Sequence, residues 1–176
     1  MTLNLDEDGK GNLAFFVASD QEIAIRMYKL LDLKPGQTVY DLGCGHGDLL
    51  LPVKTFGLNG VGFEIDYIRA HIAEERMRAN NLPVRIINDD FTKKKYWNHL
   101  TGGPIGELQI ANAHGVLLYL TDSQTLSGVE ITAPLLKKEL TPGTRIVSQS
   151  FRFPDWWECV ECVDIEGLKT LFLYEV

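Results

Sequence analysis

Hydrophobic and polar positions follow two periods along the chain, and their order predicts strands that alternate with helices. Apolar residues at helical spacing predict helices over 20–32, 48–56, 67–81 and 123–140. Short apolar runs rich in β-branched and aromatic residues predict strands over 38–42, 60–65, 84–88, 108–113 and 144–150, followed by a closing pair within "WWECVECVDI" and "LKTLFLYEV". In the helix over 67–81, the residues Ile68, Ile72 and Met77 are expected to form the buried face.

This order predicts an α/β fold. Strands separated by helices form parallel sheets with helices on both faces, a Rossmann-like doubly wound arrangement. The last two strands have no helix between them, so they should form a hairpin that turns one strand antiparallel to the rest. We expect a seven-stranded sheet, mostly parallel, with that antiparallel strand near the C-terminus. Residues 1–12 are polar and are expected to be a flexible tail, and 13–176 a single domain.

Charge and composition narrow the classes of partner. The net charge of −7 disfavours long nucleic acid, whose partners present a basic face, and favours a basic partner such as a lysine-bearing protein. No apolar run approaches the ~20 residues of a membrane span, and the first residues lack the order of a signal peptide. Three cysteines, Cys44, Cys159 and Cys162, are too few and too scattered for a disulfide framework. We therefore expect a cytoplasmic protein without a membrane partner or a metal site.

The stretch "VYDLGCGHGDLL" places Gly43, Gly45 and Gly47 directly after a predicted strand. A dinucleotide-binding loop has the pattern G-x-G-x-x-G, and here Asp48 stands at the position of its third glycine. A carboxylate at that helix N-terminus repels a diphosphate because both compete for the same donors. No Gly-Lys-Ser/Thr follows, so a P-loop is excluded as well. The glycines are either turn glycines or the wall of a site for a ligand without a diphosphate.

Three acidic residues follow successive predicted strands. Glu64 ends the second strand, where a carboxylate can accept hydrogen bonds from both hydroxyls of a ribose. Asp90 follows the third strand and either caps a turn or accepts a hydrogen bond from an exocyclic amine. Asp41 precedes the glycines and can face an ammonium. Together they favour a positively charged adenosine without phosphate, a description that S-adenosyl-L-methionine meets.

The motifs "VYDLGCGHGDLL", "GVGFEID" and "NDDF" resemble the first three motifs of class I, seven-β-strand, S-adenosylmethionine-dependent methyltransferases. The resemblance extends over most of the chain. It implies that Glu64 holds the ribose of the cofactor and Asp90 the adenine amine. It also implies that Asp41 supports the ammonium side. The methionine moiety would then lie along the backbone of the glycine loop at Gly43, Gly45 and Gly47.

Two longer stretches are similar to small archaeal and mitochondrial protein lysine methyltransferases. They are "FFVASDQEIAIRMYKLLDLKPGQTVYDLG" and "PLLKKELTPGTRIVSQSFRFPDW". The likeness implies that Ser19 contacts the methionine end of the cofactor and that Phe16 lies near the acceptor entrance. Ala18 and Asp20 replace two prolines of that subgroup. N-methylation of a protein lysine is the activity that this likeness favours.

The acceptor side has fewer signals. "ANAHG" (111–115) spans the end of the strand expected at 108–113, so Asn112 and His114 would face an acceptor, although His114 can equally be a hydrogen-bonded histidine at a strand end. Four aromatic residues either wall an acceptor channel or pack in the core: Tyr119, Phe153, Trp156 and Trp157. A small-molecule methyltransferase and a non-catalytic module that only binds the cofactor remain alternatives. Neither the acceptor nor the oligomeric state is encoded in a recognisable motif.

Overall fold

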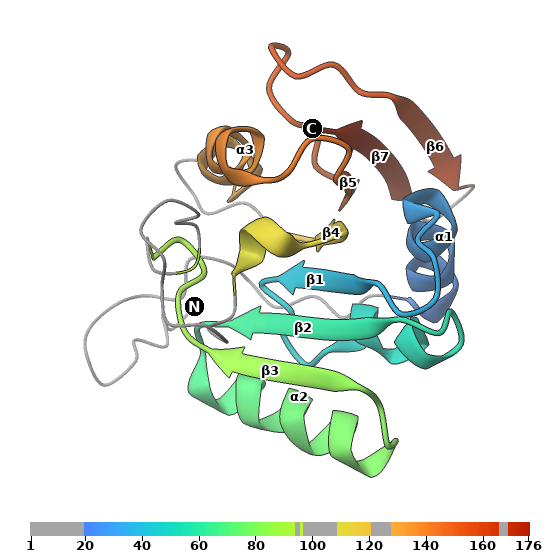
Figure 1. Cartoon of the computed structure of the whole chain (residues 1–176), viewed down its shortest axis with the longest axis vertical. Helices are drawn as coiled ribbons and strands as arrows, with labels where there is room; N and C mark the ends of the chain where they lie inside the picture. The colour runs from blue at the N-terminus through green and yellow to red at the C-terminus, as the bar shows by residue number, and fades with distance from the viewer. Residues whose placement is uncertain (1–19, 94–95, 97–108, 121–127, 166–168) are drawn as a thin grey trace, which may run out of the picture.

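A seven-stranded sheet organises the molecule (Figure 1). The computed structural model describes residues 20–93, 96, 109–120, 128–165 and 169–176. The strands are β1 (Thr38–Leu42), β2 (Asn59–Glu64), β3 (Val84–Asn88), β4 (Gly115–Leu118), β5 (Arg145–Gln149), β6 (Glu161–Ile165) and β7 (Lys169–Glu175). Their order is β3-β2-β1-β4-β5-β7-β6, and β7 pairs antiparallel with both its neighbours while β1 to β5 pair in parallel. The predicted doubly wound α/β sheet with one antiparallel strand near the C-terminus is confirmed.

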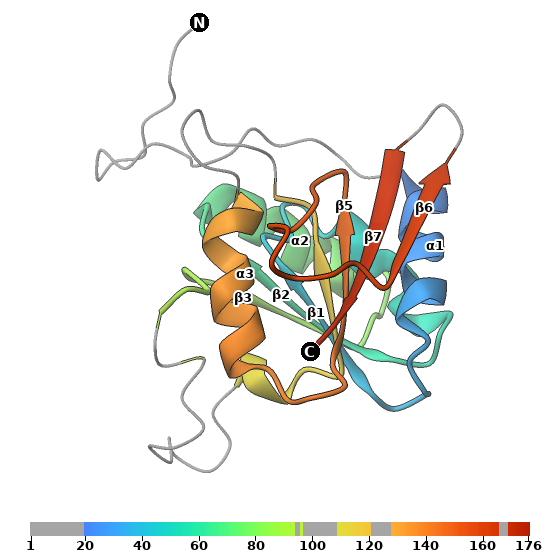
Figure 2. The ribbon, with the colours of Figure 1, turned by 90° about the horizontal axis from the view of Figure 1, so that it is seen from above.

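Helices cover both faces of this sheet, as Figure 2 shows for α1 and α3 on opposite sides. The described α-helices are α1 (Gln21–Leu31), α2 (Tyr67–Ala79) and α3 (Gly128–Glu139), and the 3₁₀ segments are η1 (Asp48–Lys54) and η3 (Ile110–Asn112). α1, η1 and Met77 of α2 belong to one core cluster, and α3 belongs to the other. Alternate residues of each strand feed these two clusters because successive side chains point to opposite faces.

Because of this alternation, successive residues of β1 pack on opposite faces of the sheet. Val39 packs in the cluster with α1, whereas Tyr40 and Leu42 pack in the cluster with α3. Asp41 stands between Tyr40 and Leu42, so its side chain points to the α1 face. Asp41 thus places a carboxylate on a strand that is buried on both sides, where the neighbouring residues are apolar or aromatic.

The fourth strand lies later than predicted. The segment 108–113 was expected to be this strand, but η3 occupies Ile110–Asn112 and β4 begins at Gly115. All residues of β4 are buried between β1 and β5, and a Cβ at Gly115 would meet Leu33 Cδ1 at 2.9 Å. The wholly apolar run that follows the turn therefore makes the central strand, because only such a run suits burial on both faces.

Helix α2 buries a different face from the predicted one. Ile68 is 68 % exposed and Ile72 37 %, while Ala70, Ala73 and Met77 are buried. Small side chains allow α2 to approach the glycine loop: a Cβ at Gly47 would lie 3.5 Å from Ala73 Cβ and 2.8 Å from Met77 Cε. Only Met77 of the three predicted face residues packs in the core.

Two further helices differ from the predictions. Asp20 is the N-cap of α1, since its side chain accepts a hydrogen bond from Glu22 N at 2.7 Å, so the helix begins one residue later than predicted. The helix expected at 48–56 is the 3₁₀ segment η1, which follows Gly47 in the left-handed region and contains Pro52. Proline lacks an N–H and favours a short, tighter turn over a continuous α-helix.

Candidate functional site

The loop that joins β1 to η1 is held by its own backbone hydrogen bonds. Gly43 N and Cys44 N both donate to Phe63 O, at 2.9 and 2.8 Å, and Gly47 N donates to Cys44 O at 2.8 Å. Gly45 N donates to Glu64 Oε2 at 2.8 Å. Four N–H groups that would otherwise cradle a phosphate are therefore already used. Asp48 disfavours a diphosphate at this loop, and the occupied N–H groups disfavour it independently.

Glycine is required in this loop for both conformation and space. Gly43, Gly45 and Gly47 have φ values of 90°, 53° and 80°, in the left-handed region that other residues adopt at a cost. A Cβ at Gly43 would lie 2.6 Å from Leu120 Cδ2, closer than real contacts allow. The alternating glycines thus let the loop turn tightly against the residue that follows β4. Their first role is structural.

Glu64 ends β2 with both carboxylate oxygens anchored. Oε2 accepts from Gly45 N at 2.8 Å and Oε1 accepts from Asp66 N at 2.9 Å, and the residue is 6 % exposed. Each carboxylate oxygen has two lone pairs, so each keeps one for a further donor. A ligand with two neighbouring hydroxyls can use both. Glu64 is fixed in place before any ligand arrives, because backbone groups hold it.

Asp41 contrasts with Glu64 because neither of its carboxylate oxygens has a hydrogen-bond partner among the residues that the structure describes. The residue is 1 % exposed, and both oxygens are buried. Burial, then the nearby negative charges of Glu64 and Asp48, raises the pKa of Asp41 well above its ordinary value. A buried carboxylate without partners costs free energy, and a ligand cation would relieve that cost. The site therefore fits a ligand that brings an ammonium to the end of β1.

Arg76 ties helix α2 to the far side of the glycine loop. One nitrogen, Nη1, donates to His46 O at 2.7 Å and to Asp48 Oδ1 at 2.8 Å. Asp48 is thus neutralised by Arg76 and fixed beside the loop. No sequence motif indicates this contact, because the two residues lie 28 positions apart.

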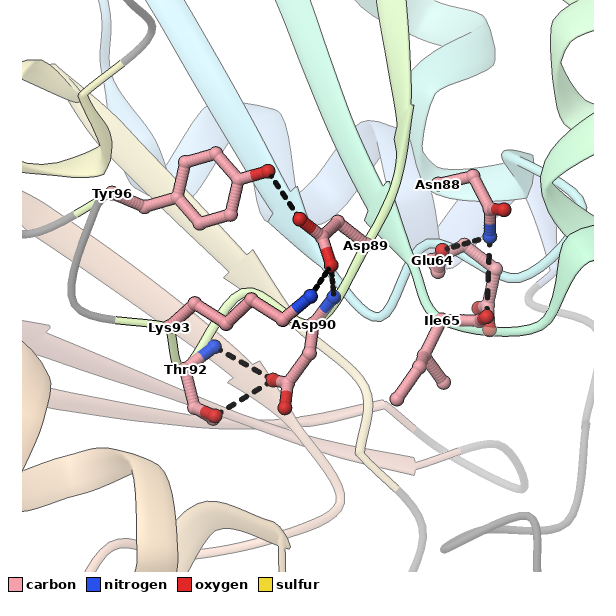
Figure 3. A network of polar contacts seen from close by, with 8 residues as sticks. All are labelled: Glu64, Ile65, Asn88, Asp89, Asp90, Thr92, Lys93 and Tyr96. Carbon is pink, nitrogen blue, oxygen red and sulfur yellow. Dashed lines mark hydrogen bonds and ion pairs between the residues drawn. The ribbon is translucent and has the colours of Figure 1, made fainter. Parts of the chain in front are cut away.

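The end of β3 carries a network of polar contacts, drawn in Figure 3. Asn88 Nδ2 donates to Glu64 O at 2.9 Å and to Ile65 O at 3.1 Å, so it joins the ends of β2 and β3. Asp90 Oδ1 accepts from Thr92 N at 2.8 Å and from Thr92 Oγ1 at 2.7 Å. The turn-capping interpretation of Asp90 is confirmed for this oxygen. The other oxygen, Oδ2, has no hydrogen bond among the described residues and can accept from a ligand amine.

Asp89 supports that turn from the other side. It accepts from Tyr96 Oη at 2.8 Å and from Asp90 N at 2.8 Å, and it pairs with the Lys93 ammonium. In Figure 3 Tyr96 and Lys93 lie on the side of Asp89 that faces away from Asn88. Asn88 and Asp89 border the candidate site. Both stand in the "NDDF" motif, but the sequence alone assigns a role only to Asp90.

The predicted site residues divide into two sets. Asp41, the glycine loop, Glu64 and Asp90 meet at the carboxyl ends of β1, β2 and β3. Asn112 and His114 do not join them, which corrects their assignment to the acceptor side. Ser19 and Phe16 lie outside the described residues.

The correction follows from the true start of β4. Asn112 and His114 precede that strand, so they lie at the amino edge of the sheet, opposite the glycine loop. His114 Nδ1 accepts from Thr38 N at 3.2 Å, and His114 N donates to Thr38 O at 3.1 Å. His114 is therefore the hydrogen-bonded histidine of the alternative interpretation, placed at the beginning of β1.

The aromatic residues are also divided. Phe153 and Trp157 are 2 % and 4 % exposed and pack with Tyr174, whose ring centroid lies 4.2 Å from that of Phe153. They belong to the core. Trp156 is 56 % exposed, while Tyr119 is half-buried at the carboxyl end of β4. Of the four candidates, Tyr119 is the one next to the glycine loop.

Other chemistries find little support in the described part of the chain. Its histidines, cysteines and acids form no group of three that could hold a metal. Its cysteines, Cys44, Cys159 and Cys162, are free thiols. No helix within the described ranges is both long and apolar enough to cross a bilayer. The carboxyl edge of the sheet carries carboxylates and glycines that suit a hydroxyl-bearing, cationic ligand.

Comparison with known proteins finds methyltransferases that are similar to this chain. No family model matches the chain. It is 28 % identical to the protein-lysine N-methyltransferase of Saccharolobus islandicus over 165 residues, which are 92 % of each protein. It is also 34 % identical to ribosomal RNA small subunit methyltransferase A of Thermotoga neapolitana, but over 87 residues that cover 33 % of that protein.

Solved structures agree on the architecture. The crystal structure of an RNA methyltransferase from Salinibacter ruber in complex with S-adenosyl-L-homocysteine superposes with a TM-score of 0.74 and 28 % identity, over 91 % of this chain and 94 % of that one. A methyltransferase from Escherichia coli superposes with a TM-score of 0.64 at 16 % identity over 95 % of this chain, a likeness of fold. With the anchored Glu64 and the buried Asp41 at the carboxyl edge, these likenesses identify the chain as a class I S-adenosylmethionine-dependent methyltransferase.

Proposed function

We propose that this enzyme transfers a methyl group from S-adenosylmethionine to the side-chain nitrogen of a lysine on a protein. The observation that carries the substrate class is the 28 % identity to a protein-lysine N-methyltransferase over 92 % of both chains. The net charge of −7 supports it, because an acidic surface attracts a lysine-bearing partner.

In this proposal the cofactor lies across the carboxyl ends of three strands. Glu64 accepts hydrogen bonds from the ribose hydroxyls with the lone pairs that Gly45 N and Asp66 N leave unused. The second oxygen of Asp90 accepts from the adenine amine. Asp41 accepts from the ammonium of the methionine moiety, which supplies the partner that both of its oxygens lack.

The glycine loop and Ser19 complete the proposed cofactor site. Gly43, Gly45 and Gly47 have no side chains that would separate the loop from a ligand, so the loop backbone would border the methionine moiety. Ser19 would contact the same moiety from the segment that precedes α1, and Phe16 would border the acceptor entrance. Both assignments rest on the resemblance of that segment to the lysine methyltransferases.

Lysine methylation sets its own demands on the protein. When bound, the cofactor supplies an electrophilic methyl group: the nitrogen lone pair forms the new C–N bond while the C–S bond breaks and its electron pair stays on sulfur. The amine must be neutral to attack, and its ordinary pKa is about 10.4. The protein must therefore desolvate the amine and release its proton to water, and it must hold the nitrogen in line. None of this requires a dedicated base.

Methylation of RNA is a second candidate, favoured by the likeness to the RNA methyltransferase of Salinibacter ruber over 91 % of this chain. The net charge of −7 disfavours RNA as the substrate. A protein that neutralises phosphates presents a basic face, and this chain carries seven more acidic than basic residues.

Incubation of the enzyme with methyl-labelled cofactor and a cell lysate separates these candidates. One half of the products is treated with protease and the other half with ribonuclease. We expect the macromolecular label to be lost with protease, to survive ribonuclease, and to appear as methyllysine after acid hydrolysis. The Glu64→Ala variant is the matched control and should give background label.

Loss of label with ribonuclease would establish the RNA activity instead. Label found only in small molecules would exclude both proposals in favour of a small-molecule acceptor.

A further inference from the structure

The carboxyl edge of the sheet continues beyond the proposed cofactor site into β4. In the β1–β4 ladder Asp41 lies opposite Leu117, so two residues further on Tyr119 is level with Gly43. Leu117 packs in the α1 cluster, and Tyr119 packs against the same cluster. Tyr119 and Asp41 therefore lie at the same edge and on the same face of the sheet. The contact between Leu120 and Gly43 shows how closely the end of β4 approaches the glycine loop.

Lys169 lies at this same edge, although its strand, β7, runs in the opposite direction to β5. Since β7 is antiparallel, it begins where β1 to β5 end, and Gln149 of β5 lies opposite Leu171. Ser150 N donates to Thr170 O at 2.8 Å, so Lys169 lies level with Phe151. Leu171 and Leu173 pack in the α1 cluster, which places Lys169 on that face too.

Tyr119 and Phe151 form an aromatic seat for an ammonium, and Lys169 occupies it. Lys169 Nζ donates to the Tyr119 hydroxyl and lies 4.2 Å from the centroid of the Tyr119 ring. The ring centroids of Tyr119 and Phe151 are 6.3 Å apart. Within the described ranges no carboxylate forms an ion pair with Lys169. A ring and a hydroxyl place no full negative charge beside the amine, unlike a carboxylate.

Such a seat has the properties that an acceptor amine needs before methyl transfer. The proposed cofactor order, with adenine at β3, ribose at β2 and methionine at β1, leaves β4 as the next strand and the open side for an acceptor. Building on the proposed lysine activity, we propose that Tyr119, with Phe151 beside it, binds the acceptor amine, and that Lys169 is a built-in occupant that an incoming lysine displaces. Tyr119 is then a specificity-determining residue, and Lys169 weakens the binding of acceptors.

Steady-state kinetics on a lysine-bearing protein acceptor, at saturating cofactor, test this proposal. Lys169→Met removes the occupant, so we expect the KM for the acceptor to fall about fivefold with little change in kcat. Tyr119→Leu removes the ring and hydroxyl, and kcat/KM should fall about tenfold. Tyr119→Phe, which keeps the ring, should lose less.

The chain offers a matched control. Lys137 Nζ lies 4.6 Å from the centroid of Trp157, a similar contact on α3 away from the glycine loop. Lys137→Met should leave the KM unchanged. An acceptor KM that Lys169→Met leaves unchanged or raises overturns the role of Lys169, and an unchanged kcat/KM in Tyr119→Leu overturns the seat. Binding of S-adenosylhomocysteine and the melting temperature, measured for each variant, separate these effects from misfolding.

If the unmodified enzyme methylates no lysine-bearing acceptor, the proposed function has failed, and the seat is tested without turnover. n-Butylammonium, which reproduces the end of a lysine side chain, is titrated into the enzyme saturated with S-adenosylhomocysteine and followed by NMR of the aromatic rings. Tighter binding by Lys169→Met than by the unmodified protein, and weaker binding by Tyr119→Leu, would support the seat. Equal binding by all three overturns it.

Discussion

The carboxyl edge of the sheet is built from two kinds of side chain on its two sides. At β1, β2 and β3 it is acidic: Asp41, Glu64 and Asp90 follow one another along the chain, and backbone N–H groups hold two of them. At β4, β5 and β7 it is aromatic and basic, where Tyr119 and Phe151 meet Lys169. The first side suits hydroxyls, an amine and a fixed ammonium. The second suits an amine that must lose its proton.

Within the acidic side, Asp41 and Glu64 make a second contrast. Both are buried, yet Glu64 accepts two backbone hydrogen bonds while neither oxygen of Asp41 has a partner in the described part of the chain. Glu64 stabilises the loop with or without a ligand, whereas Asp41 destabilises the unbound protein and becomes favourable only beside a cation. Substitutions at the two positions should therefore differ in the sign of their effect on stability.

The largest effect is expected from Glu64→Ala. It removes the proposed acceptor for two ribose hydroxyls, so affinity for S-adenosylhomocysteine should fall about a hundredfold, roughly 3 kcal/mol. The melting temperature should fall as well, because Gly45 N and Asp66 N lose their acceptor. Calorimetric titration measures the affinity. Glu74→Ala, which changes an exposed glutamate of α2, is the control, and equal affinity in the two variants would contradict the assignment.

Asp41→Asn should weaken binding and stabilise the unbound protein. Affinity for S-adenosylhomocysteine should fall about tenfold, since a charged hydrogen bond becomes a neutral one. Removal of a buried, unpartnered charge should raise the free energy of unfolding by about 1 kcal/mol or more at pH 8. Denaturant unfolding without ligand measures this change. A loss of stability would mean that Asp41 has a stabilising partner in the free enzyme.

The stability difference between the unmodified enzyme and Asp41→Asn should depend on pH. The folded pKa of Asp41 lies above its unfolded value, so the folded state binds the proton more tightly. Stability conferred by this group is therefore present at or below the ordinary carboxyl pKa and is lost as pH rises through the raised one. Unfolding curves across that range should show the advantage of Asp41→Asn growing with pH. A constant difference would contradict a buried, titrating Asp41.

Asp90→Asn should have the smallest effect. One carboxylate oxygen is used by the Thr92 turn, and only the other is proposed to accept from the adenine amine. A neutral amide that offers this hydrogen bond less well should cost about fivefold in affinity for S-adenosylhomocysteine. S-Inosylhomocysteine, which has a carbonyl in place of the amine, should bind the two proteins more equally. Unchanged discrimination between the two ligands would remove Asp90 from adenine recognition.

The difference between the two sides also explains what could be predicted from the sequence. Glu64 ends one strand, Asp90 closely follows the next, and both sit in short motifs, so their meeting follows once the strands are parallel. The sequence predicts Asn112 and His114 at the wrong edge because the run before β4 has the pattern of a strand, while the strand itself begins at Gly115. The alternation that marks an exposed strand is absent from "GVLL", which is buried on both faces.

Contacts between distant residues could not be predicted. Lys169 meets Tyr119 across 50 positions, and Arg76 meets Asp48 across 28. The first contact depends on the order of the strands in the sheet. The second depends on which face of α2 packs inward. Helix α2 illustrates the limit, since its isoleucines suggested one face and the need to approach Gly47 selected another, lined by Ala70 and Ala73.

The most direct test of the contrast between Asp41 and Glu64 is the preference for S-adenosylhomocysteine over 5′-methylthioadenosine. The second ligand keeps the adenosine and thioether but lacks the ammonium and carboxylate of the amino acid. Affinities of both are measured for the unmodified enzyme, Asp41→Asn and Glu64→Ala. We expect Asp41→Asn to reduce the preference about tenfold and Glu64→Ala to weaken both ligands without changing it. Equal weakening of both ligands by Asp41→Asn would contradict the pairing of this carboxylate with the ammonium of the cofactor.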